Sequence, residues 1–131
     1  MQLVSVDAAQ EIPIVDAVVG GQRDFHRVRL VFDTGSGLTQ LDTNLIETLG
    51  YSASDGEQRL VIVGATGEEV DGFSLRVESL AFLGHKLSNA RVGVFDFSHH
   101  DRYGIHGLLG WDIIKQLHLE LDGPAGMLKV F

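Results

Sequence analysis

The chain has 131 residues, no cysteine and a formal net charge of -8. Its length fits one domain, and its 44% of hydrophobic and 21% of charged residues are ordinary for a globular protein. The acidity argues against binding to nucleic acid or to an anionic membrane surface, and the missing cysteines exclude disulfides, thiol catalysis and thiolate metal sites. No signal peptide is visible, and no apolar run approaches the ~20 residues that span a bilayer. We therefore expect a cytoplasmic protein or a soluble domain of a larger one.

The chain predicts short strands separated by glycine-bearing turns, with two short helices. In chain order, strands are expected over residues 14–19, 26–32 and 38–41, followed by a short helix around 45–49 and a strand over 59–63. One or two strands then lie within 70–83, with a turn near Asp71 and Gly72, and another strand covers 90–97. A helix over 111–117 and a terminal hairpin of 118–121 with 127–131 complete the chain. Asp42 to Asn44 supply N-cap chemistry for the first helix, and Gly50 ends it. Because strands do not alternate with helices, this order favours a closed or sandwich-like all-β architecture.

Two stretches of the chain are expected to differ in flexibility. Residues 1–11 have strand character only near Leu3 to Val6, which predicts a flexible N-terminal arm. Residues 12–131 form one continuous domain in this interpretation, since no linker, repeat or low-complexity segment interrupts them.

The strongest chemical signal is Asp33, which directly follows an apolar strand and directly precedes Thr34, Gly35 and Ser36. A carboxylate beside a buried strand loses solvation and needs hydrogen bonds to remain charged. Gly35 lets backbone amides approach closely, and the two hydroxyls donate and accept nearby. Asp-Thr-Gly also occurs in loops whose aspartate only stabilises a turn, and the apolar strand in front of it favours the functional interpretation.

Two motifs together resemble a known family. Residues 31–36 (Val-Phe-Asp-Thr-Gly-Ser) resemble the active-site loop of aspartic peptidases. Residues 107–114 (Gly-Leu-Leu-Gly-Trp-Asp-Ile-Ile) resemble the second hallmark of the single-lobed, retroviral-type branch, in which two apolar residues and a glycine precede the C-terminal helix. The strands between the motifs have the matching order, so the likeness covers residues 12–131 and points to bacterial retropepsin-like proteins.

The resemblance implies a closed acid-protease-type β-barrel with one lobe per chain. It also implies an aspartic endopeptidase that needs no cofactor or metal and acts as a homodimer on extended peptide or unfolded protein. Since the chain has a single Asp-Thr-Gly, two copies of Asp33 have to meet across a two-fold axis. Two carboxylates in contact share a proton, so that one activates water while the other polarises the scissile carbonyl.

The same resemblance gives roles to the neighbours of Asp33. Thr34 would brace the two loops across the axis, Gly35 would line the substrate cleft, and Ser36 would hydrogen-bond the outer carboxylate oxygen. The expected flap, a hairpin that closes over bound peptide, comprises Val63, Gly64, Ala65, Thr66 and Gly67. The motif expected to pack behind the Asp33 loop comprises Leu108, Leu109 and Gly110. An exposed turn and a plain core strand are the respective alternatives, and Asp112 is interpreted as a structural carboxylate at a helix start.

Three other functions compete with this one. His99, His100, Asp101 and nearby His106 offer metal ligands, although adjacent loop residues rarely converge on one ion. Ser36 as the nucleophile of a Ser-His-Asp hydrolase lacks the nucleophile-elbow spacing. The serious alternative is a non-catalytic dimerisation or peptide-binding module on the same fold, which the absence of an aromatic residue in the flap favours. Against the module, Asp33, Thr34 and Gly35 are all intact.

Overall fold

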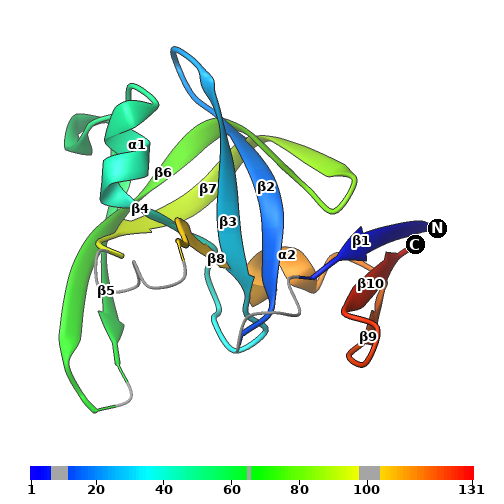
Figure 1. Cartoon of the computed structure of the whole chain (residues 1–131). Helices are drawn as coiled ribbons and strands as arrows, with labels where there is room; N and C mark the ends of the chain where they lie inside the picture. The colour runs from blue at the N-terminus through cyan, green and yellow to red at the C-terminus, as the bar shows by residue number, and fades with distance from the viewer. Residues whose placement is uncertain (7–11, 65, 98–103) are drawn as a thin grey trace.

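The computed structural model describes residues 1–6, 12–64, 66–97 and 104–131 of the chain. Its strands are β1 (Gln2–Ser5), β2 (Ile14–Gly20), β3 (Phe25–Phe32), β4 (Gln40–Asp42), β5 (Gln58–Val63), β6 (Glu69–Phe82), β7 (His85–Phe95), β8 (Gly107–Leu109), β9 (Leu119–Asp122) and β10 (Met127–Val130). The helices are α1 (Thr43–Thr48), α2 (Trp111–Ile114) and the 3₁₀ turn η1 (Ala53–Asp55). The expected all-β fold with two short α-helices is confirmed (Figure 1).

Six strands close into a barrel in the order β2-β3-β8-β4-β7-β6 (Figure 1). Closure comes from β2, which pairs with β3 along one edge and with the second half of β6 along the other. The first half of β6 pairs instead with β5, so β5 lies outside the ring as one arm of a hairpin. The closed barrel with a single lobe per chain, which the family resemblance implies, is therefore confirmed.

The core lies inside this barrel and under the two helices. On β2, Val15, Ala17 and Val19 point inward while Asp16 is exposed, which is the period of two expected of a strand with one buried face. The largest fully buried side chains are Leu30, Leu41, Ile46, Leu49, Leu75, Leu80, Leu109 and Leu128. Helix α1 begins where expected, because the Asp42 carboxylate accepts a hydrogen bond from the Asn44 amide.

The prediction of a turn near Asp71 and Gly72 is wrong, because β6 runs without interruption through both residues. They pair with Val61 and Leu60 of β5. A Cβ at Gly72 would lie 2.5 Å from the Phe95 ring and 2.3 Å from the Val94 carbonyl oxygen. The glycine therefore makes room for a neighbouring strand and does not reverse the chain. The second helix is also shorter than expected, since α2 ends at Ile114.

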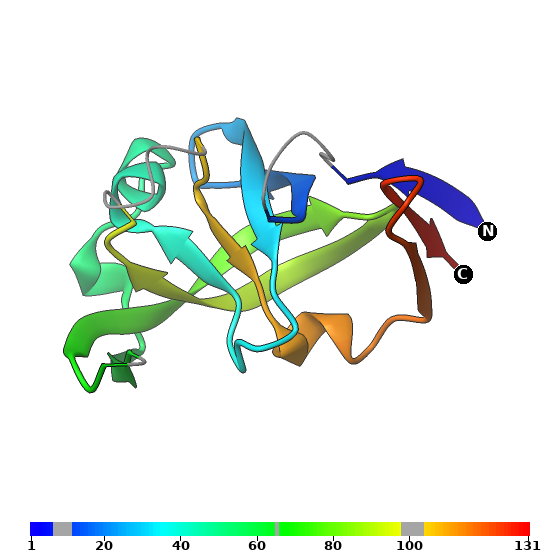
Figure 2. The same ribbon diagram turned by 60° about the horizontal axis from the view of Figure 1, so that its bottom comes forward.

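Both ends of the chain meet in a separate three-stranded sheet of order β1-β10-β9 (Figure 2). The expected terminal hairpin is β9 and β10, which pair antiparallel. Of the residues expected to form a flexible arm, Gln2–Ser5 are strand β1 and pair with β10, while residues 7–11 lie outside the described part of the chain. None of the described helices is long and apolar enough to cross a membrane.

Candidate active site

Asp33 is placed by two parallel strands that end together. Strand β8 pairs in parallel with β3, with Phe32 opposite Leu109, so the chain leaves both strands at the same edge of the barrel. The first residue beyond β3 is Asp33, whose amide donates to the Leu109 carbonyl over 3.0 Å. The loop that follows β3 then runs beside α2, the helix that follows β8 (Figure 2).

The Asp33 carboxylate is half-buried and has a fixed local partner. Its Oδ1 accepts a hydrogen bond of 2.9 Å from the Gly35 amide, and the Ser36 amide approaches the Asp33 carbonyl at 3.4 Å. These contacts form a tight turn that presents the carboxylate away from the core. Thr34 lies exposed at the tip of this turn.

Ser36 is oriented differently from the expectation. Its hydroxyl donates to the Leu38 carbonyl at 2.9 Å and receives the Gln40 side-chain amide at 3.3 Å, so its only proton is not directed at the Asp33 carboxylate. The Leu38 carbonyl is two residues away in the same loop. The Ser36 hydroxyl therefore bonds within its own loop and to Gln40. Neither partner is a histidine, as the serine of a hydrolase triad would require.

The second motif lies directly behind the Asp33 loop. Leu109 is fully buried, and the Trp111 amide at the start of α2 donates to the Ser36 carbonyl over 2.6 Å. A Cβ on Gly110 would lie 2.6 Å from the Leu38 carbonyl carbon, so only glycine lets the two backbones approach this closely. Leu108 is half-buried and faces a groove beside Asp33.

This groove has a volume of about 930 Å³ and lies between the Asp33 loop, the β5–β6 hairpin and the end of β7. Its lining residues are Asp33, Gly35, Ser36, Gly37, Gln40, Val61, Ile62, Val63, Glu68, Val70, Phe95, Asp96, Phe97 and Leu108. They combine apolar side chains with three carboxylates, and no Lys, Arg or His is among them. A groove of this size, with a hairpin along one side, suits an extended peptide.

The β5–β6 hairpin contains the residues expected to form the flap. Gly64 and Glu68 close its end through a hydrogen bond of 2.8 Å from the Gly64 amide to the Glu68 carbonyl, and Gly67 has a left-handed φ of +88°. A hydrogen bond from the Thr66 hydroxyl lowers the pKa of the exposed Glu68 carboxyl. Val63 is exposed and lines the groove, and Ala65 lies outside the described residues.

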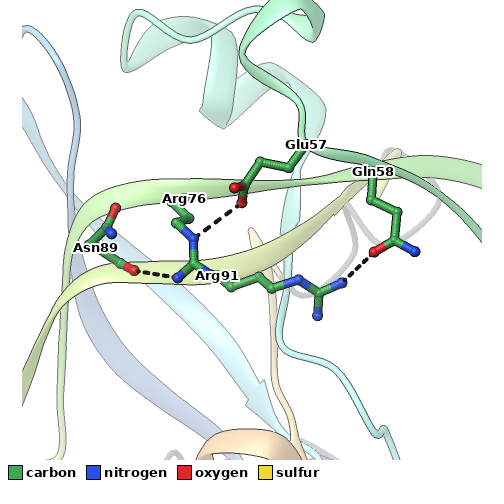
Figure 3. Close-up of polar contacts among 5 residues, drawn as sticks. All are labelled: Glu57, Gln58, Arg76, Asn89 and Arg91. Carbon is green, nitrogen blue, oxygen red and sulfur yellow. Dashed lines mark hydrogen bonds and ion pairs between the residues drawn. The ribbon is translucent and has the colours of Figure 1, made fainter.

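Polar contacts hold the base of the hairpin to the barrel wall (Figure 3). The Arg76 guanidinium on β6 pairs with Glu57 at 3.3 Å and donates to the Asn89 carbonyl at 3.2 Å. Arg91 on β7 reaches the Gln58 side chain at 3.4 Å. Because these groups are exposed to solvent, each contact contributes little to stability.

Sequence analysis missed several residues of the site. Gln40 is buried beside Ser36, and Phe95 and Phe97 line the groove at the end of β7. Thr39 is fully buried and bonds to Asp112. The signal for Thr39 and Gln40 was present, because two adjacent polar residues interrupt the apolar run between Leu38 and Leu41.

Of the four residues considered as metal ligands, His106 alone lies in the part of the chain that the structure describes. His106 Nδ1 accepts a hydrogen bond of 3.0 Å from the Arg29 amide, and the His106 amide donates to the Arg29 carbonyl at 2.8 Å. Among residues 1–6, 12–64, 66–97 and 104–131, no three His, Asp or Glu side chains are grouped to hold an ion. His99, His100 and Asp101 lie outside these residues.

Comparison with known proteins agrees with this geometry. The sequence model of the family described as aspartyl protease matches residues 15–113, which is most of the chain. The chain therefore belongs to the aspartyl protease family.

Solved structures show which branch the fold resembles. A retropepsin-like aspartic protease from Rickettsia conorii superposes with a TM-score of 0.69 at 15% identity, covering 99% of this chain and 97% of that one. The EIAV protease in complex with the inhibitor HBY-793 superposes with a TM-score of 0.57 at 21% identity, covering 82% of this chain and 88% of that one. No curated protein sequence matches significantly. The fold is thus retropepsin-like.

Proposed function

We propose that the protein is an aspartic endopeptidase in which Asp33 from each of two subunits forms the catalytic pair. The observation that supports this most is that Asp33, held by the Gly35 amide, lines a groove large enough for an extended peptide. Val63 and Val70 of the hairpin and Leu108 beside Asp33 would contact the substrate side chains.

A pair of carboxylates supplies the chemistry that one cannot. Two carboxylates in contact share one proton, since both cannot ionise easily. The ionised member removes a proton from water as the oxygen adds to the scissile carbonyl carbon, and the protonated member donates to the carbonyl oxygen. As the tetrahedral intermediate collapses, the carbon–nitrogen bond breaks and the leaving amine takes up the proton that the first carboxylate removed from water. A hydroxyl of the intermediate returns a proton to the second carboxylate, which restores the starting pair.

The surface beside Asp33 supports contact with a second copy. Thr34 lines a depression with Phe32, Trp111 and Leu121, and the last two side chains are 48% and 59% exposed. Apolar side chains gathered on the surface in this way mark interaction sites. If the same face of a second subunit packs here about a two-fold axis, the two Asp33 loops meet, with Thr34 of each at the contact.

The test compares Asp33→Asn with Glu47→Gln, a matched change at an exposed position of α1 outside the groove. We expect Asp33→Asn to lower peptide cleavage by about a thousandfold or more while the unfolding midpoint and the dimer mass stay unchanged. Glu47→Gln should cleave like the unaltered protein.

Mixing adds a test of the dimer. After subunit exchange with an equal amount of Asp33→Asn, the activity of the unaltered protein should fall to about half, because mixed dimers lack one carboxylate. A strict monomer at every concentration contradicts the shared pair. A protein that binds peptide equally well with and without the Asp33 carboxylate, and never cleaves it, is the non-catalytic module instead.

A further inference from the structure

We propose that Thr39 and Asp112 are positioning residues, which fix the far end of the Asp33 loop so that Asp33 keeps its orientation. This inference rests on the proposed peptidase function. Neither residue lines the groove, so each would act through the loop and not on the substrate.

Three donors converge on one oxygen of Asp112. Its Oδ1 accepts from the Thr39 hydroxyl at 2.8 Å, from the Thr39 amide at 3.0 Å and from the Ile113 amide at 3.0 Å. The Thr39 hydroxyl in turn accepts from the Gly110 amide at 2.9 Å. Thr39 is fully buried, so its hydroxyl both donates and accepts inside the protein.

These bonds complete a series that follows the whole loop. Asp33 at its start donates to Leu109, Ser36 in its middle accepts from Trp111, and Thr39 at its end bonds to Gly110 and Asp112. The first two links join backbone atoms and are available to any residue type. The last link depends on a hydroxyl and a carboxylate, so it is the link that the sequence specifies by side chain.

A carboxylate at the start of α2 has a simpler explanation, in which it only offsets the helix dipole. That role needs a negative charge but no particular partner, and α2 has only four residues. The positioning role needs an acceptor oxygen and the Thr39 hydroxyl, but not the charge. The two roles therefore predict opposite results for Asp112→Asn, which removes the charge and keeps an oxygen at the same place.

The test uses four variants of the full chain. Thr39→Val removes the side-chain hydrogen bonds to Asp112 and Gly110 but keeps the hydrogen bond from the amide of residue 39. Asp112→Ala removes the shared acceptor, whereas Thr39→Ser and Asp112→Asn preserve all of these bonds. We expect the first two to lower kcat by about tenfold to a hundredfold with KM changed by less than about twofold, because Asp33 is misplaced while the groove is intact. The conservative pair should stay within about threefold of the unaltered protein. Thr48→Val is the matched control, since that exposed hydroxyl donates to the Asn44 carbonyl within α1.

A second readout needs no substrate. In Thr39→Val, hydrogen exchange of the Asp33 and Gly35 amides should speed up by about tenfold or more, while that of the Val19 amide in β2 stays the same. This pattern separates loosening of the loop from loss of the fold. If the unaltered protein shows no cleavage but this pattern holds, the peptidase function fails and the loop link stands.

Several results would overturn the proposal. One is a folded Thr39→Val with unaltered kcat and exchange. Another is a kcat of Thr39→Ser as low as that of Thr39→Val, or a kcat of Asp112→Asn as low as that of Asp112→Ala. If Thr39→Val and Asp112→Ala do not fold, the proposal depends on the conservative pair, and a tenfold loss of kcat in either folded variant contradicts it.

Discussion

The Asp33 loop and the β5–β6 hairpin border the same groove, but they are held by different kinds of contact. The loop is tied to the backbone of Leu109 at its start and of Trp111 in its middle. At its end, the fully buried Thr39 bonds to the Gly110 amide and the Asp112 carboxylate. Within the described residues, β5 of the hairpin pairs on one side only, with β6, and Val63 near its end is 67% exposed.

In the proposed peptidase, this difference would match two separate requirements. A reacting carboxylate has to stay within a fraction of an ångström of its productive position, and the ties of the loop would hold Asp33 in this way. A covering element has to open and close, and such elements come from the least stable parts of a fold. The ion pair of Arg76 with Glu57 lies at the base of the hairpin and is exposed, so it contributes little to stability.

The largest effect is expected where the loop and α2 touch. Gly110→Ala places a methyl group against the Leu38 backbone and should lower the free energy of unfolding by about 2 kcal/mol, because neither backbone can move aside easily. Gly123→Ala is the control, since a Cβ there meets nothing within 4 Å. Chemical denaturation measures both, and equal stabilities would show that the contact is not tight.

A smaller effect is expected in the hairpin, and on binding instead of stability. Val63→Ala should change the free energy of unfolding by less than about 0.5 kcal/mol because the side chain is mostly exposed. Its KM for peptide should rise by about threefold to tenfold, since the lost methyl groups line the groove. Leu3→Ala removes a comparably exposed side chain from β1 and should leave KM unchanged. If Val63→Ala has the same KM as Leu3→Ala, then Val63 does not contact the substrate.

The smallest effect is a response of the hairpin tip to acid. The Thr66 hydroxyl holds the pKa of Glu68 below the ordinary value of 4.5, so the folded chain favours the ionised form. The stability that this hydrogen bond adds is fully present above pH 4.5. It is lost as the pH falls through the lowered pKa of Glu68. Below about pH 4.5, hydrogen exchange of the Gly64 and Gly67 amides, corrected for the intrinsic rate, should rise. In Thr66→Ala the same amides should already exchange fast at pH 6, and a pH response unchanged by this substitution would contradict the assignment.

Much of the barrel was predictable, because its signals are local. Alternation along β3, the N-cap at Asp42 and the order of the two motifs all lie within short stretches of sequence. The placement of Asp33 needed only the apolar strand before it and the family resemblance.

What was missed depends on residues far apart in the chain. Thr39 and Asp112 are 73 positions apart, and nothing near either one indicates the other. Gly72 was interpreted as a turn because glycine is common in turns, whereas its reason for being there is the Phe95 ring of the neighbouring strand. The family resemblance implies a hydrogen bond from Ser36 to the Asp33 carboxylate, whereas in the folded loop the Ser36 hydroxyl donates to the Leu38 carbonyl.

The pairing of β2 with β6 also bears on how quickly the chain reaches its native state. Val19 lies opposite Leu80, so the ring cannot close until segments from opposite halves of the sequence have found each other. Proteins dominated by such distant pairings fold in about milliseconds to seconds, more slowly than helical bundles of similar size. A newly made chain therefore exposes its strand edges to other molecules for longer, which makes dilution and low temperature sensible conditions for refolding it.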